Sequence, residues 1–227
     1  MTILPFASQS AEEWIDRFDP QKRYLTGDMY LFIKRVMDIA LVVLSMPLWV
    51  PALAIIGLVI RFTSPGAPVI FKQLRTGKGG SRFNMYKFRT MVPNAEELKS
   101  KYMHLNELQW PDFKITNDPR VTRVGKFLRK TSLDELPQLL NVLRGEMSLV
   151  GPRPTSFGPE TYKLWHTSRL DVKPGMTGLW QIFGRAQLEF DDRLRLDIAY
   201  IERASLWLDI QILLLTVVAA FQQRGAH

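Results

Sequence analysis

The sequence predicts an α+β fold, mostly helical with a small β-hairpin, in a monotopic membrane protein that carries a re-entrant helix–break–helix near its N-terminus. Residues 39–60 form an almost wholly apolar run without charge, interrupted by prolines. Two short segments rich in aromatic and β-branched residues flank the glycine-rich loop 76–80, as in a hairpin. Apolar residues recur at helical spacing in residues 121–128 and 190–201. Together these patterns favour helices around one small sheet.

The apolar run is long enough to cross a bilayer once. As a straight helix it would extend about 33 Å, against a hydrocarbon core of about 30 Å. Pro47 and Pro51 each remove a backbone donor, and Ser45 can bond a freed carbonyl. Cations flank both ends, so the positive-inside rule places both ends in the cytoplasm; they are Lys34, Arg35, Arg61, Lys72 and Arg75. We therefore expect a hairpin that breaks at Ser45 and Pro47 and returns to the same leaflet, with a single crossing as the alternative.

Composition narrows the class of partner. A net charge of +8 and a pI of about 9.8 favour an anionic partner. The chain has no cysteine, which excludes disulfides and thiolate sites, and its three histidines show no metal-ligand spacing. No nucleic-acid motif is present, and the basic residues alternate with acids and prolines. We expect a phosphate-bearing substrate or an anionic membrane surface, and no nucleic acid.

Two adjacent carboxylates, Asp134 and Glu135, lie in a strongly basic part of the chain. The neighbouring cations are Arg123, Lys126, Arg129, Lys130, Arg144 and Arg153. Carboxylates can act as nucleophile, base or metal ligand while cations hold phosphate oxygens. The pattern therefore suits chemistry on a phosphate ester.

A purely structural role for both acids is the alternative. Residues 132–135 fit a capping box, in which the two acids only start a helix. Pro137 disfavours a helix that begins at Ser132, because it would face a carbonyl of the preceding turn. A start at or just after Asp134 accommodates the proline better. The expected buried face is then Leu136, Leu139, Leu140 and Leu143.

Four further residues are candidates for the site. In the predicted strand 83–91, Lys87 and Arg89 share one face and are spaced to clamp a diphosphate, although a solvated strand face has the same spacing. Arg153 lies between two prolines that restrict its backbone, and an incidental arginine in a turn is the alternative. Asp197 falls within the apolar stripe of the helix predicted over residues 189–203. A buried carboxylate needs an arginine, a metal or a substrate as partner; Arg193, one turn earlier, is the plain structural choice.

Taken together, these stretches resemble the bacterial sugar transferases, the monotopic phosphoglycosyl transferases that prime polyprenyl-phosphate-linked glycans. The matching motifs are Lys34-Arg-Val-Met-Asp38, Ser64-Pro-Gly66, Tyr86-Lys-Phe-Arg-Thr-Met91, Asp118-Pro-Arg-Val-Thr-Arg-Val-Gly125, Ser132-Leu-Asp-Glu-Leu-Pro-Gln138, Leu149-Val-Gly-Pro-Arg-Pro154, Lys173-Pro-Gly-Met-Thr-Gly178 and Gly184-Arg185. The resemblance covers residues 31–222. The chain is similar in size to the minimal catalytic unit of that family. Ser45-Met-Pro47 departs from it, since many relatives have serine directly before proline.

The resemblance implies transfer of a sugar 1-phosphate from a UDP-sugar to a polyprenyl phosphate, undecaprenyl phosphate, at the cytoplasmic face of the bacterial inner membrane. This is the first membrane step in making exopolysaccharide, capsule, O-antigen or glycoprotein glycans. It implies that Asp134 is the nucleophile, forming a covalent phosphosugar and releasing UMP, and that Glu135 is a Mg²⁺ ligand. The residues that we assign to phosphate or substrate binding are Lys87, Arg89, Arg129, Arg153, Arg185 and Asp197.

The expected organisation has four parts. Residues 1–30 form an N-terminal extension, residues 31–62 the re-entrant hairpin, residues 63–204 the cytoplasmic catalytic domain, and residues 205–227 an interfacial helix and tail. Two rival functions stay open: a UDP-sugar hydrolase, and a non-catalytic tether that binds anionic lipid or a partner. The sugar, the glycan pathway and the oligomeric state, a homodimer included, are not fixed by the sequence.

Overall fold

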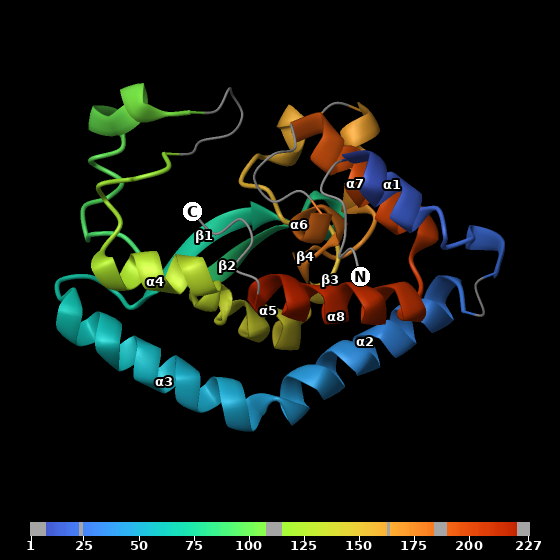
Figure 1. Cartoon of the computed structure of the whole chain (residues 1–227), viewed down its shortest axis with the longest axis horizontal. Coiled ribbons are helices and arrows are strands. Elements are labelled where there is room, and N and C mark those ends of the chain that lie inside the picture. Colours follow the sequence, from blue (N-terminus) through green and yellow to red (C-terminus); the bar gives the residue numbers. More distant parts are fainter. Residues whose placement is uncertain (1–7, 23–24, 108–114, 163, 184–189, 222–227) are drawn as a thin grey trace.

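The computed structural model describes residues 8–22, 25–107, 115–162, 164–183 and 190–221 (Figure 1). Its helices are α1 (Ser8–Ile15), α2 (Gly27–Leu44), α3 (Met46–Thr63), α4 (Arg123–Thr131), α5 (Gln138–Arg144), α6 (Leu179–Phe183), α7 (Phe190–Arg203) and α8 (Leu206–Phe221). Its strands are β1 (Ile70–Thr76), β2 (Arg82–Phe88), β3 (Ser148–Val150) and β4 (Gly175–Thr177). A mostly helical fold with a small β component is confirmed.

Helices α2 and α3 form a broad V along one side of the molecule (Figure 1). They meet at Ser45, whose hydroxyl donates to two carbonyls in the last turn of α2, at 2.7 and 3.1 Å. The indole of Trp49 donates to the carbonyl of Val42 at 2.9 Å, across the same bend. Pro47 lies in the first turn of α3, where no intrahelical donor is lost, and Pro51 lies inside the helix. The apolar run is therefore two helices joined at a bend.

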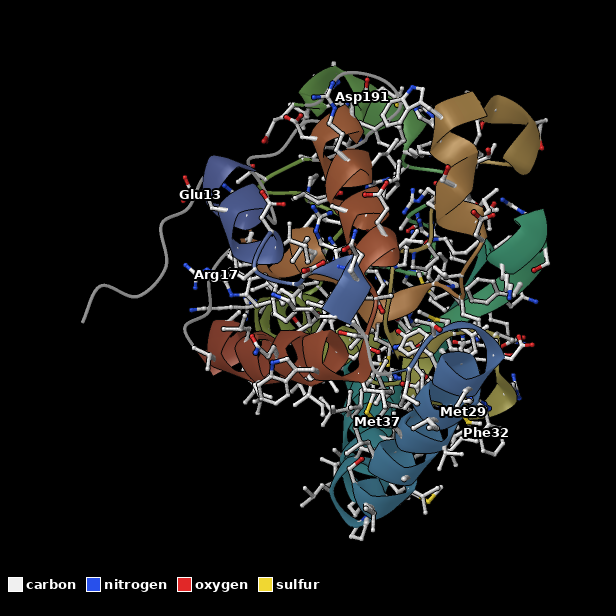
Figure 2. All side chains as sticks on the ribbon, turned by 90° about the vertical axis from the view of Figure 1, so that its right-hand side faces the viewer. Glu13, Arg17, Met29, Phe32, Met37 and Asp191 are labelled. Carbon is white, nitrogen blue, oxygen red and sulfur yellow. The ribbon has the colours of Figure 1, made fainter. Side chains whose placement is uncertain are left out.

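Much of the surface of these helices is apolar and exposed. By length and composition, α3 is the one helix among the described residues that could cross a membrane, and 11% of that segment is buried; α8 is apolar but shorter. Figure 2 shows Met29 and Phe32 on α2 at the opposite end of the molecule from Asp191 on α7. The exposed large apolar residues of α3 and α8 are Leu48, Val50, Ile55, Leu58, Val59, Phe62, Trp207, Ile210, Leu214, Val217 and Val218. Such a surface is typical of a membrane or protein contact.

Polar contacts join α2 to the rest of the chain. Asp38 is buried and accepts hydrogen bonds from Ser148 Oγ, at 2.7 Å, and from the next backbone N–H of β3. Lys34 does not pair with Asp38, one turn away, but with buried Asp209 on α8, at 2.8 Å. Arg35 donates to two carbonyls at the C-terminal end of α5. These contacts fix α2, the first arm of the apolar V, against β3, α5 and α8.

The predicted hairpin is confirmed with different bounds. Strands β1 and β2 are antiparallel, with Ile70 opposite Phe88 and Thr76 opposite Arg82. Gly79, at φ 63°, supplies the left-handed turn. The first strand reaches Thr76, although the sequence predicts a strand only over residues 69–71, and the second ends at Phe88 rather than at residue 91. A parallel pair of β3 and β4 was not predicted, because three-residue strands leave no periodic signal.

The start of α5 corrects the sequence prediction. The helix begins at Gln138, and Asp134 precedes it in the 3-10 turn Leu133–Glu135. Leu139 is buried as expected, but Leu140 is exposed. Asn141 takes an inward position instead, donating to the Asn84 carbonyl at 2.8 Å. A buried amide that joins α5 to β2 therefore occupies a place that hydrophobic periodicity cannot anticipate.

Candidate active site

The two adjacent carboxylates lie on a tight turn between α4 and α5. Ser132, at φ 57°, adopts a left-handed conformation that ends α4 and reverses the chain. Leu133 and Leu136, on either side of the acids, pack into an apolar cluster that includes Ile60 of α3. The acidic turn and α3 therefore pack into the same apolar cluster.

The turn faces a pocket of about 610 Å³, within the range typical of small-molecule sites. The charged residues that line it are Lys87, Arg89, Glu96, Lys99, Arg120, Arg129, Asp134, Glu135 and Arg153. The structure thus brings Lys87, Arg89, Arg129 and Arg153, from separate segments, to one cavity with both acids. Six cations and three acids in that list leave an excess of positive charge, which suits a polyanionic ligand.

Glu135 is held between two cations. Its Oε1 lies 2.7 Å from Lys87 Nζ and 2.5 Å from Arg153 Nη2, and its Oε2 accepts from Arg153 Nη1 at 3.2 Å. Burial alone would raise the pKa of Glu135, but the attraction of Arg153 and Lys87 outweighs it and holds the pKa well below its ordinary value. Glu135 is therefore a fixed anion that orients Lys87 and Arg153.

Asp134 lies in the opposite electrostatic situation. It lines the pocket, and its carboxylate makes no hydrogen bond or ion pair with any residue that the structure describes. Burial raises the pKa of Asp134, although Lys87, Arg129 and Arg153 act against that shift. A carboxylate with little direct stabilisation, in a cationic pocket, is free to attack an electrophile. The two neighbouring acids are thus divided into one anchored and one available group.

Two arginines of the pocket have no carboxylate partner in the described part of the chain. Arg129 donates from Nε to the hydroxyl of Thr90 at 2.9 Å. Arg89 is only 9% exposed, and its Nη2 donates to the carbonyl of Ser64. Its Nε and Nη1 are buried without a hydrogen-bond partner among the described residues. These guanidinium groups are available to an anionic ligand.

Asp197 lies behind the pocket and not on its wall. It is buried in α7 and accepts from Arg169 Nη2 at 2.7 Å, and the same nitrogen donates to the backbone carbonyl of Arg153 at 2.6 Å. Its partner is therefore Arg169, 28 positions earlier, and not Arg193, whose guanidinium lies over the Trp180 ring. The contact supports the loop that presents Arg153, so Asp197 reaches the site only indirectly. Arg185, the other predicted substrate residue, lies outside the described residues.

The sequence analysis missed several residues of the wall. Trp180 and Gln181 of α6 line the pocket, and so does Arg120, which pairs with Asp118 at 2.7 Å. The glycines and the proline around Trp180 hide the five-residue helix α6 from an analysis of hydrophobic periodicity. Glu96, also on the wall, lies in a region of turns that precedes the 3-10 helix Ser100–Leu105.

A Mg²⁺ ion fits this site only together with a substrate. Among the described residues, no three acidic or histidine side chains come close enough to hold a metal ion. Mg²⁺ usually takes one or two carboxylates, with phosphate oxygens and water completing its shell. The Oε2 atom of Glu135 accepts one long hydrogen bond and keeps acceptor capacity. The acidic pair thus offers the protein ligands of such a site, and substrate phosphates and water would complete it.

Comparison with known proteins defines the class. The model of the bacterial sugar transferase family matches residues 29–223, so the chain belongs to that family. This confirms the resemblance that the motifs indicated.

The chain is also similar to individual curated proteins. It is 44% identical over 199 residues to the galactosyl transferase CpsE of Streptococcus agalactiae, covering 87% of this chain and 44% of the relative. It is 43% identical over 201 residues to the undecaprenyl-phosphate galactose phosphotransferase of Salmonella typhimurium, covering 86% and 42%. It is 39% identical over 199 residues to the exopolysaccharide production protein ExoY of Rhizobium meliloti, covering 86% and 88%. The chain thus spans less than half of the first two relatives and most of the third.

Proposed function

We propose that this chain is a phosphoglycosyl transferase that moves a sugar 1-phosphate from a UDP-sugar to a polyprenyl phosphate, through a covalent intermediate on Asp134. The observation that carries the proposal is the division of the acidic pair. Asp134 is unpaired and faces a cationic pocket, while its neighbour Glu135 is fixed by Lys87 and Arg153. The names of the relatives, which include an undecaprenyl-phosphate galactose phosphotransferase, support the same reaction class.

In the first step, a carboxylate oxygen of Asp134 attacks the β-phosphorus of the donor. A new P–O bond forms to Asp134, and the bond from that phosphorus to the bridging oxygen breaks. UMP leaves with the bond electrons, and the sugar phosphate remains on the enzyme as an acyl phosphate. No proton transfer is required, because an ionised carboxylate attacks and an ionised phosphate leaves.

In the second step, a phosphate oxygen of the lipid acceptor attacks the same phosphorus. The P–O bond to Asp134 breaks, the carboxylate returns to its ionised form, and a lipid-linked sugar diphosphate is released. Lys87 and Arg153, oriented by Glu135, lie where they can neutralise charge on the transferring phosphate.

Glu135 and the substrate phosphates would hold Mg²⁺, which when bound supplies further neutralisation of the diphosphate charge. The other roles belong to the chain's own side chains. Arg129, from α4, points into the same pocket and is a second phosphate-binding group.

The apolar V explains how a water-soluble donor and a lipid acceptor meet. We propose that α2 and α3 form a re-entrant hairpin in the cytoplasmic leaflet of the inner membrane, with α8 lying in its interface. Leu133 and Leu136, beside Asp134, pack in the same cluster as Ile60 of α3. This packing supports a position of the reactive turn close to the lipid surface. A phosphate at the membrane surface would then reach Asp134 without leaving the headgroup region.

The test is a single-turnover assay without lipid. Membrane preparations given Mg²⁺ and a panel of UDP-sugars should release about one UMP per enzyme and then stop, because the phosphosugar waits for its acceptor. The Asp134→Asn variant should give no burst. A UDP-sugar hydrolase would instead release UMP continuously without lipid, and a non-catalytic tether would release none with any donor; either result would reject the proposal.

A further inference from the structure

Arg89 is buried with few hydrogen-bond partners, an environment that is unfavourable for a cation without a bound ligand. Its side chain is 9% exposed, its Nε and Nη1 find no hydrogen-bond partner among the described residues, and it lines the pocket. A buried polar group without partners costs free energy, and more so when it is charged. Lys87 and Arg120 each pair with a carboxylate, that of Glu135 and that of Asp118, and Arg129 donates to the Thr90 hydroxyl. Arg89 thus has the properties of a binding group whose partner is an anion from outside.

The position of Arg89 indicates the direction from which that anion comes. Its Nη2 donates to the carbonyl of Ser64, the residue that ends α3. Its backbone N–H donates to the carbonyl of Val69 at 2.8 Å, and the Val69 side chain lies against Gly57 of α3. Both ends of the residue are therefore attached to the end of the apolar V, at the wall of the pocket.

Apolar side chains lie exposed on both sides of this junction. Phe62, in the last turn of α3, is 79% exposed. Phe71, on β1, is also exposed and lines the pocket itself. A ligand that reaches Arg89 along α3 would pass apolar surface before it meets a buried guanidinium. An exposed apolar surface that leads to a buried cation suits a phosphate monoester on an apolar chain. It suits a nucleotide less well, because a nucleotide has no apolar tail.

We infer that Arg89 binds the phosphate of the lipid acceptor, while Lys87 and Arg153 serve the donor diphosphate. This inference rests on the proposed function and adds to it a division of the pocket into two phosphate subsites. The acceptor subsite lies at the end of α3, and the donor subsite lies at Glu135. Asp134 lies in the same pocket and would exchange the sugar phosphate between them.

The kinetic test uses Arg89→Gln and Arg89→Lys in the full chain. We expect Arg89→Gln to raise the KM for a short-chain polyprenyl phosphate at least tenfold, with less than a twofold change in the KM for the UDP-sugar. Arg89→Lys keeps the charge, so its KM for the polyprenyl phosphate should lie between those of Arg89→Gln and the wild type. The matched control is Arg61→Gln, which removes an exposed cation from the last turn of α3 and should leave both constants within twofold.

A binding measurement makes the inference independent of turnover. In the Asp134→Asn background, affinity for the polyprenyl phosphate should fall at least tenfold when Arg89→Gln is added, whereas affinity for UDP should hold. A water-soluble phosphate monoester should bind the parent protein more weakly, because it lacks the apolar chain, and should also lose affinity in Arg89→Gln, because it carries the same phosphate. Unchanged lipid affinity, or a selective loss of UDP affinity, would overturn the inference. A missing UMP burst in the wild type would instead reject the proposed function and leave this binding result to decide on Arg89.

Discussion

Replacing Glu135 by glutamine should destabilise the protein as well as impair catalysis. Its carboxylate accepts from Lys87 at 2.7 Å and from Arg153 at 2.5 Å. The three side chains are 19, 16 and 31% exposed, so solvent screens the pairs only in part. Glutamine can keep one hydrogen bond but not the charge, and two cations would remain in a half-buried site.

The magnitude follows from those contacts. Hydrogen bonds to charged groups contribute about 1.5–3 kcal/mol each, against about 0.5–1.5 kcal/mol for neutral ones. Two such bonds weakened in Glu135→Gln give a loss of about 2–3 kcal/mol in the free energy of unfolding. For a chain of this size, that loss lowers the Tm by about 4–12 °C.

The pH dependence of the stability difference gives a second test. Because the folded pKa of Glu135 is depressed, its stabilisation is complete above the unfolded pKa, near 4, and is lost as pH falls toward the folded value. The Tm difference between wild type and variant should therefore be constant above about pH 5 and shrink in more acidic buffer.

Thermal unfolding in detergent, followed by circular dichroism, measures both effects. The matched control is Glu96→Gln, which changes the same residue type on the same pocket, where the side chain is 87% exposed and its salt bridge to Lys99 is long, at 3.8 Å. We expect that control to change stability by less than about 0.5 kcal/mol. Equal Tm values for Glu135→Gln and the wild type at neutral pH would refute the reasoning.

Three other variants test the supports of the site. Asp197 has a pKa raised to about 6 by burial, against the attraction of Arg169, so it loses its charge, and with it the ion pair to Arg169, as pH falls through 6. Turnover should show an acid limb near pH 6 that Asp197→Asn removes, with a lower plateau; an unchanged profile would contradict the link to Arg153. Gly125→Ala would place a Cβ 2.0 Å from the backbone oxygen of Thr90, two residues after β2, and should cost about 1–3 kcal/mol of stability, seen as a lower urea midpoint. Lys34→Met leaves Asp209 fully buried without its cation and should cost about 3–5 kcal/mol; a Tm within 2 °C of the wild type would argue against that pair.

Local chemistry in the sequence was enough for the parts of the site that are close together along the chain. The adjacent acids, the alternation of Lys87 and Arg89, and the rigid prolines around Arg153 each identified residues that line one cationic pocket in the structure. The break near Ser45 followed from proline chemistry and was found where expected. In these places one or two neighbouring residues determine the structure.

Contacts between distant segments could not be predicted. The place of Asp197 on an apolar helix face indicated that this carboxylate needs a partner. No rule of sequence spacing favours Arg169 over Arg193 as that partner. Lys34 and Asp209 are 175 positions apart, and their pairing depends on how α8 packs on α2. The same holds for Asn141, whose amide reaches β2 only because α5 lies against that strand. Tertiary packing, and not residue type, selected each of these pairs.

The central claim is a covalent bond to one aspartate. The most direct measurement is peptide mapping by mass spectrometry of enzyme quenched after exposure to a UDP-sugar and Mg²⁺ without lipid. The account predicts a sugar phosphate on the peptide that contains Asp134, lost on addition of polyprenyl phosphate and absent in Asp134→Asn. Lipid-linked product formed with an unmodified enzyme, or a sugar phosphate found on another residue, would contradict it.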